Sequence, residues 1–518
     1  MANKSIFTSI RGQLLPATNV LNKHAAPAYS YSDAHALAQV AMTGTFGALT
    51  YSDPLEELEY VLNLSESVDP TFLAKAAIYT RQNGHMKDMP ALLLAVLARL
   101  DPVLFTAAFP HVVDNGKMLR NFVQIIRSGQ TGRKSLGSAP KRMVANWLNS
   151  ASDWAVLNAN IGNDPSLADV IKMVHPKPES KAREALFAWI IGKPCDVTLL
   201  PEAVQNYLRF KETGKGPMPD VPFQMLTQLP LTSKHWAKIA KNASWQMTRM
   251  NLNTFLRHGV LDMANMRKHV AATLRNPARI KKARVFPYQL MTAYQALSDD
   301  MPAEIREALH DAMELAVENV PAFKGSVVVC PDVSGSMDCP VTGYRVGATT
   351  ATRFVDVAGL VAAATLRKNP RALILPFEVR VRETHLEPKD TILTNARRLA
   401  DLGGGGTNCS APLEWLVAKG KAPDLVIFVS DNQSWADAQY AGHGTEMMKQ
   451  WELLKRRNPS AKLVCIDIAP YGTTQAKERK DVLNIGGFTD GVFKQIADFA
   501  AGKLGPSHWV GEIKNVKL

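Results

Sequence analysis

An apolar run that leads into a string of oxygen-bearing side chains constrains this chain most. Residues 327–330 form the run, and Asp332, Ser334 and Ser336 follow it at alternate positions. A short apolar run of this kind predicts a buried strand of a parallel sheet, and the loop after such a strand lies at the sheet's carboxyl edge. Gly335 allows a tight turn that brings the three side chains together. One carboxylate and two hydroxyls are hard oxygen ligands, which favour a divalent cation such as Mg²⁺.

Two later segments supply what such a site still lacks. Glycines 403–406 precede Thr407, and the apolar run 425–429 ends in Ser430 and Asp431. A lone Asp-x-Ser-x-Ser string is more often a turn or a helix cap, but three segments in this order, each beside an expected strand or helix, favour a metal. We therefore predict a site for Mg²⁺ or another divalent cation, with open positions for water or a partner's carboxylate. Its ligands are Asp332, Ser334, Ser336, Thr407 and Asp431.

The last third of the chain alternates between strand and helix patterns. Expected strands are 325–331, 371–377, 378–384, 424–430 and 462–468, and expected helices are 354–367, 410–419, 447–457 and 491–500. Apolar strands separated by helices predict an α/β fold with a doubly wound, mainly parallel sheet. The tail at 502–518 contains Trp509 and Ile513 and could dock back as an added strand.

The first two-thirds has little strand signal and many helical patterns. Expected helices are 71–81, 89–100, 117–128, 140–149, 167–175, 181–191 and 303–320. Helices of this length between short turns predict paired-helix stacking, and without a clean repeat period the best description is a degenerate helical-repeat array. We therefore expect two domains, 1–322 and 323–518, joined at 321–324 without a long linker.

Positive charge is concentrated in the helical part. The formal net charge is +13, residues 231–284 hold twelve Lys or Arg and one acid, and residues 102–149 hold seven and one. Solubility alone favours mixed signs, so these segments predict a polyanionic partner such as a phosphate backbone.

Composition also sets the compartment. Apolar residues make up 46% of the chain and charged residues 21%, and no window approaches the roughly 20 apolar residues of a membrane span. The first residues lack the continuous apolar segment of a signal peptide. The five cysteines contain no Cys-x-x-Cys pair and are best interpreted as incidental thiols of a reducing compartment. We expect a cytoplasmic protein without a membrane partner.

These segments resemble a known family. The three metal-site segments resemble the metal-ion-dependent adhesion site (MIDAS) of the von Willebrand factor A domain. A long basic helical part before such a domain resembles the Ro autoantigen family, whose helical part is the TROVE module. The stretches that carry the resemblance are 76–87, 132–134, 141–147, 174–178 and 281–287. The absence of a secretory signal and the modest similarity look more like a bacterial member than an animal one.

The resemblance implies a HEAT-like helical-repeat ring with a basic central hole, followed by a Rossmann-like A domain. In that family the hole receives single-stranded 3′ ends of misfolded non-coding RNAs, and the outer face holds Y RNA. Bacterial relatives use Y RNA to tether the ring to polynucleotide phosphorylase. It further implies a non-catalytic protein of RNA quality control, and a closed single-chain ring favours a monomer.

Candidate RNA contacts follow from the basic segments. Weaker candidates are Arg81 and His85. The main candidates are Arg120, Arg127, Arg133, Lys134, Lys141, Arg142, His175, Lys177, Arg249, Arg257, Lys281, Lys282 and Arg284. For each residue alone, a solvated or structural role is about as common as RNA contact.

Two other functions stay open at this point. Carboxylates with Mg²⁺ can cleave phosphodiesters, but Asp332 and Asp431 offer ligands for only one metal, and the sequence shows no general base or phosphate-binding GxxxxGK[ST] loop. A metal-dependent, adhesion-type module would bind a partner's acidic residue, but it would leave the basic helical part unexplained.

Overall fold

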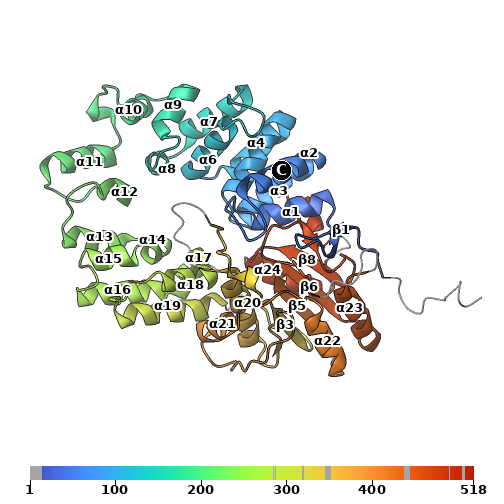
Figure 1. Cartoon of the computed structure of the whole chain (residues 1–518). Coiled ribbons are helices and arrows are strands. Elements are labelled where there is room, and N and C mark those ends of the chain that lie inside the picture. The colour runs from blue at the N-terminus through green and yellow to red at the C-terminus, as the bar shows by residue number, and fades with distance from the viewer. Residues whose placement is uncertain are drawn as a thin grey trace, which may run out of the picture. The chain divides into compact units, whose positions relative to one another are not determined.

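The computed structural model describes residues 15–283, 285, 287–317, 320–344, 352–436, 444–488, 490–504 and 508–518. They form two compact units (Figure 1). The A-domain unit comprises the described residues of 1–61, 284–296 and 309–512, and the helical unit comprises those of 62–283, 297–308 and 513–518. The expected domain boundary between residues 322 and 323 stays a prediction. It is a single cut in the sequence, whereas each compact unit is built from three separate segments.

A parallel sheet of five strands forms the centre of the A-domain unit. Its order is β4 (Leu373–Ile374), β3 (Val327–Pro331), β5 (Leu425–Ser430), β6 (Lys462–Asp467) and β8 (Val482–Gly486). Every residue of β3, β5 and β8 is buried, as expected for strands covered on both faces. The doubly wound α/β architecture predicted from the sequence is confirmed.

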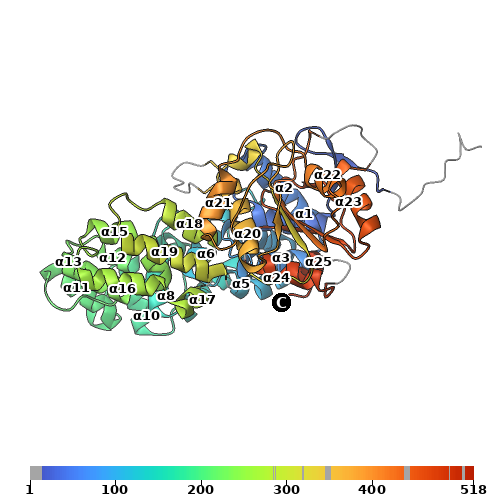
Figure 2. The same ribbon diagram turned by 90° about the horizontal axis from the view of Figure 1, so that it is seen from below.

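Helices cover both faces of this sheet. α22 (Ala411–Ala418) and α23 (Glu446–Arg457) pack on one face, where Trp451 is fully buried against Val426 and Phe428. α20 (Phe354–Lys368) and α21 (Ile392–Ala400) lie on the other side of the sheet (Figure 2). α18 (Pro287–Gln295) packs on α20, and α24 (Asp490–Ala500) lies beside β8. The carboxyl ends of β3 and β5 therefore meet at one edge of a well-supported sheet.

The N-terminal segment belongs to the A-domain unit, which the sequence did not indicate. β1 (Val20–Leu21) pairs antiparallel with β2 (Pro27–Ser30), and β2 pairs with β7 (Thr473–Thr474). α1 (Asp33–Thr43) then packs beside β8. Strands of two to four residues carry too little periodicity to be recognised in a sequence.

The helical unit is built from consecutive short helices. Neighbouring helices contact one another in succession, for example α3 with α4 and α5, and α7 with α9 (Figure 1). Phe105, Phe109 and Phe122 form a fully buried aromatic cluster between α5 and α6. The helices of this unit, with two that straddle both units (α2 and α19), are α2 (Pro54–Ser67), α3 (Pro70–Gln82), α4 (Asp88–Leu100), α5 (Pro102–Val112), α6 (Gly116–Arg127), α7 (Ser138–Ser150), α8 (Asp153–Ala159), α9 (Leu167–Val174), α10 (Lys181–Ile190), α11 (Glu202–Thr213), α12 (Phe223–Leu226), α13 (Ser233–Asn242), α14 (Trp245–Met250), α15 (Leu252–Arg257), α16 (Ala264–Leu274), α17 (Pro277–Ala283) and α19 (Ala303–Ala316).

Two expected strands were wrong. Residues 378–384 form a turn, in which Glu378 N–H donates to the Arg380 carbonyl at 3.1 Å and the Arg382 guanidinium pairs with the Glu378 carboxylate at 2.9 Å. The C-terminal tail does not add a strand but forms α25 (His508–Lys514). Trp509 and Ile513 are both buried, which places residues four apart on one helical face. Among the described residues, no helix is both long and apolar enough to cross a bilayer.

Candidate functional site

Three loops meet at the carboxyl edge of the central sheet. Gly404 N–H donates to the Val333 carbonyl at 3.1 Å, and Gly335 N–H donates to the Gly405 carbonyl at 3.1 Å. Trp435 N–H donates to the Thr407 carbonyl at 3.0 Å. These hydrogen bonds join the loop after β3, the glycine loop and the loop after β5. All five predicted metal ligands are buried on these loops.

Asp332 is the most enclosed of the five. One carboxylate oxygen accepts the Ser334 N–H at 2.8 Å, and the other accepts the Ser430 hydroxyl at 2.6 Å. Burial, together with the nearby negative charge of Asp431, raises the pKa of Asp332 to about 7. Two buried carboxylates, one of which raises the pKa of the other, are costly to ionise together without a cation.

Asp431 carries the clearest sign of a missing partner. Its Oδ1 accepts the Gln433 N–H at 3.2 Å, but its Oδ2 is buried and has no hydrogen-bond partner among the residues that the structure describes. Burial raises the pKa of Asp431, while the nearby Ser336 hydroxyl opposes the shift. The Oγ atoms of Ser334 and Ser336 lie 3.4 Å apart. An unpartnered carboxylate oxygen among hydroxyls fits a hard divalent cation.

Hydroxyls are essential to this candidate site. The described residues contain no group of three or more His, Cys, Asp or Glu side chains that could hold a metal ion by themselves. A cation here would depend on Ser334, Ser336 and Thr407 as well as on the two carboxylates. This donor set is typical of an oxygen-ligated Mg²⁺ and not of zinc.

N-terminal residues that no sequence pattern singles out also lie beside this site. Asn22 Nδ2 donates to the Ser434 carbonyl at 2.5 Å, and the Thr50 hydroxyl donates to the Ser336 carbonyl at 3.4 Å. Burial raises the pKa of Tyr51, and the negative charges of Asp431 and Asp332 raise it further. These contacts join residues 286 to 412 positions apart, and no local pattern signals them.

Some of the predicted RNA-binding residues are engaged inside the helical unit. Arg120 donates to the carbonyls of Ile161, Asn163 (3.3 Å) and Pro165 (3.5 Å), and burial lowers its pKa. Arg133 donates to the Ala98 carbonyl at 3.2 Å. These contacts fix loops and helix ends within the helical unit, and the RNA contacts of both residues stay predictions.

Two other arginines are also partly engaged. Arg249 is only half-exposed. The weaker candidate Arg81 pairs with Asp114 at 2.9 Å and donates to the Met86 carbonyl at 3.0 Å. His85, the other weaker candidate, adopts a left-handed backbone with φ 53°.

Most of the other predicted RNA contacts point to solvent. His175 ends α9 in a left-handed conformation, and Arg127 touches the Met173 sulfur. Arg284 lies outside the described residues. The exposed members are Arg127, Lys134, Lys141, Arg142, His175, Lys177, Arg257, Lys281 and Lys282.

The fold and this site define a class of protein: a von Willebrand factor A domain in a chain that also carries stacked helices. Residues 326–500 match the family described as the Ro60 vWA domain. The chain is 25% identical to the RNA-binding protein RO60 of Deinococcus radiodurans, over 92% of this chain and 94% of that protein. These findings confirm the predicted resemblance to the Ro family.

A solved structure agrees with this assignment. The crystal structure of the Deinococcus radiodurans RO (RSR) protein superposes with a TM-score of 0.63 at 21% identity, covering 91% of this chain and 100% of that one. At this identity the match establishes the fold: a helical part followed by an A domain with a parallel sheet.

Proposed function

We propose that this protein is a non-catalytic RNA-binding protein of RNA quality control. It binds Y RNA and the single-stranded 3′ ends of misfolded non-coding RNAs, and Y RNA links it to an exoribonuclease of the polynucleotide phosphorylase type. It acts as a monomer in the cytoplasm. The name of its Deinococcus relative and the match to the Ro60 vWA domain support the RNA-binding part of this proposal.

One observation carries the proposal. Lys134, Lys141 and Arg142 lie in a segment nearly free of acids, are exposed, and make no ion pair with any residue the structure describes. Exposed cations without acidic neighbours retain their full charge for phosphate groups. Such contacts favour RNA without reading its sequence.

A divalent cation completes the proposal. Asp332, Ser334, Ser336, Thr407 and Asp431 would hold it, because the unpartnered oxygen of Asp431 and the two serine hydroxyls fit an oxygen-ligated ion. The cation would neutralise the carboxylate pair and offer a position to a partner's carboxylate. A metal-dependent interaction module is therefore the second candidate function, and it is compatible with the first.

RNA binding across a salt series tests the main proposal. The probe is a short RNA duplex with a single-stranded 3′ overhang, and the variant replaces Lys134, Lys141 and Arg142 with Ala. With about 0.7 counterions released per single-strand phosphate contact, the slope of log affinity against log salt should fall by about 2. At moderate salt the affinity should fall by at least about tenfold.

A matched variant provides the control. Lys193, Lys211 and Lys215 are also exposed on the helical unit, and their replacement by Ala removes the same charge. Equal losses in both variants would show only general electrostatic attraction and would reject the predicted contacts. Magnesium-dependent cleavage of the probe, lost in Asp332→Ala, would overturn the non-catalytic assignment.

A further inference from the structure

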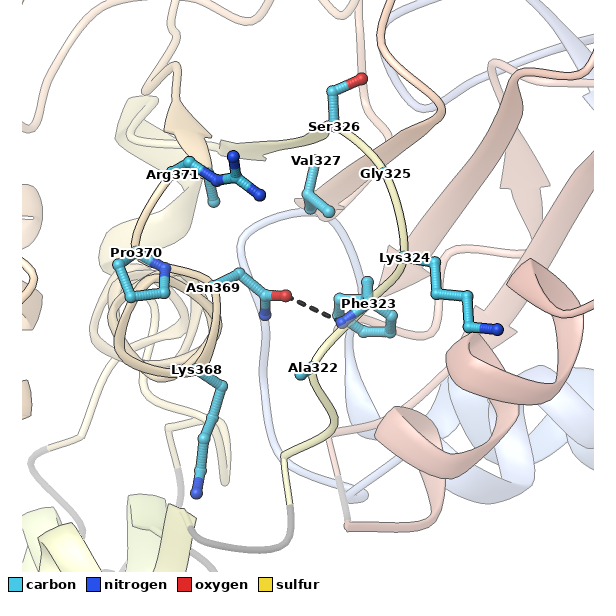
Figure 3. A pocket seen from close by; sticks show the side chains of 11 residues that line it. Ala322, Phe323, Lys324, Gly325, Ser326, Val327, Lys368, Asn369, Pro370 and Arg371 are labelled. Atoms are coloured by element: carbon cyan, nitrogen blue, oxygen red, sulfur yellow. Dashed lines mark hydrogen bonds between the residues drawn. The ribbon is translucent and has the colours of Figure 1, made fainter.

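A cavity of about 650 Å³ opens in the A-domain unit at the other end of the sheet from the candidate metal site. The segment that leads into β3 and the turn between α20 and β4 form its walls (Figure 3). We call it the basic pocket. It is lined by Ala322, Phe323, Lys324, Gly325, Ser326, Val327, Lys368, Asn369, Pro370, Arg371 and Ala372. Its volume lies within the range of small-ligand sites.

The neutral polar side chains of the basic pocket are already engaged. Asn369 Oδ1 accepts the Phe323 N–H at 2.8 Å, and its Nδ2 donates to the carbonyls of Pro321 (3.3 Å) and Thr365 (3.0 Å). Ser326 donates through N–H and hydroxyl to Asp424, at 2.8 and 2.9 Å. Both amide hydrogens of Asn369 and the hydroxyl hydrogen of Ser326 are therefore used, and neither side chain has a donor left for a nucleobase or a sugar.

The cations of the basic pocket are not engaged. Lys324, Lys368 and Arg371 make no ion pair and no side-chain hydrogen bond with any described residue. One carboxylate, Asp424, contacts the lining, and it is held by Ser326 and by Asn458 Nδ2, the latter at 3.0 Å. Among its side chains, the lining therefore offers a ligand three free positive charges.

The three cations are placed differently. In Figure 3 the guanidinium of Arg371 extends over the space beside Val327, whereas Lys324 and Lys368 extend from the rim in other directions. A planar guanidinium suits bidentate contact with phosphate, and flexible lysine chains can turn toward an anion that Arg371 holds. The geometry gives Arg371 the leading role.

We propose that the basic pocket binds the phosphate groups of single-stranded RNA. An anionic, sequence-independent ligand follows from the free cations and the saturated amide and hydroxyl. Assigning the phosphates to an RNA strand rests on the proposed function, whereas assigning phosphate as the ligand chemistry does not. A free nucleotide is the other source of the same chemistry, and the experiment separates the two.

Binding to the full-length chain tests this proposal with three probes: a single-stranded RNA of about ten nucleotides, adenosine diphosphate and inorganic pyrophosphate. The variant replaces Lys324, Lys368 and Arg371 with Ala. For RNA, three lost phosphate contacts should lower the salt slope by about 2, and affinity should fall about tenfold. Arg371→Ala alone should account for the largest single share.

A control variant removes the same charge from elsewhere on the A-domain unit. Lys389, Lys421 and Lys480 are exposed there, and their replacement by Ala should change each affinity less than about twofold. Loss of RNA binding only in the basic-pocket variant supports the strand assignment. Loss of diphosphate and pyrophosphate binding in that variant, with RNA unaffected, supports the phosphate site and assigns it to a free nucleotide.

Two results would overturn the proposal, and they differ from failure of the proposed function. If RNA, diphosphate and pyrophosphate bind the basic-pocket variant and wild type equally, or if no probe binds wild type, the basic pocket is not a phosphate site. If wild type binds pyrophosphate but not RNA, and the basic-pocket variant no longer binds pyrophosphate, the proposed function fails and the phosphate site stands.

Discussion

In the A-domain unit Asp332, Asp431 and Asp467 are each at most 2% exposed, whereas Lys141 and Arg142 of the helical unit are open to solvent. Burying a carboxylate is costly, so the fold must hold each buried one with specific hydrogen bonds or supply a cation. An exposed lysine has no such requirement. In the A-domain unit, the groups around a buried carboxylate therefore indicate its role. In the helical unit, the surroundings of an exposed lysine do not.

The largest expected effect tests the buried region. Magnesium should stabilise the wild-type protein by about 2.7 kcal/mol when its concentration is 100 times the dissociation constant. Asp431→Ala should remove this stabilisation, because it deletes the carboxylate with the unpartnered Oδ2. Thermal unfolding with and without magnesium measures the difference.

Asp338→Ala provides the control for that measurement, because Asp338 lies near the site in sequence but pairs with Arg353 at 2.8 Å. Its magnesium response should match that of wild type. An equal response in Asp431→Ala would show that the carboxylate pair holds no cation.

The sequence predicted this site because strand ends and loop composition are local properties. The alternation of Asp332, Ser334 and Ser336 after an apolar run is visible without any structure. The N-terminal cover over the site was invisible, since Thr50 meets Ser336 only in the folded chain. Likewise, Arg120 and Lys141 look alike in sequence, and only the three carbonyls that Arg120 reaches distinguish them.

Another carboxyl of the A-domain unit, that of Glu478, should make the stability of the protein depend on pH. Burial raises the pKa of Glu478 from 4.5 to about 8, although Asn484 donates its N–H and its side-chain amide to Oε2 at 2.9 Å each. The folded protein then holds a proton that the unfolded chain has released. This contribution to stability is complete below pH 4.5 and is lost as the pH rises toward 8.

Glu478→Gln should remove that dependence, because an amide of the same shape does not titrate. The free energy of unfolding of wild type relative to the variant should fall by about 1.4 kcal/mol per pH unit within the window. Denaturant unfolding at about pH 5, 6 and 7 measures the slope. A constant difference between the two proteins would mean that the folded carboxyl is already ionised.

The third prediction compares an arginine and a lysine on the same helix, α6, where only the arginine side chain is engaged by hydrogen bonds with described residues. Arg120→Ala should destabilise the protein by about 1–3 kcal/mol, because the carbonyls of Ile161, Asn163 and Pro165 lose their donor. Lys117→Ala, an exposed change on the same helix, should cost less than about 0.5 kcal/mol. If both changes cost the same, Arg120 is not the brace that its hydrogen bonds indicate.

The smallest effect on stability is expected at Lys141, and it sharpens the comparison from the opposite side. Lys141→Ala should change the free energy of unfolding by less than about 0.5 kcal/mol, because the side chain is exposed and has no ion-pair partner among the described residues. The same change should lower the slope of log affinity against log salt for single-stranded RNA by about 0.7. Lys141→Arg, which keeps the charge, should leave this slope at the wild-type value. A stability loss above about 1 kcal/mol, or an unchanged slope, would make Lys141 a structural or merely solvated residue. The contacts of a buried charge indicate its role, whereas the role of an exposed charge shows only when its ligand binds. The unfolding and RNA-binding measurements on Lys141→Ala therefore decide whether this exposed charge of the helical unit serves binding.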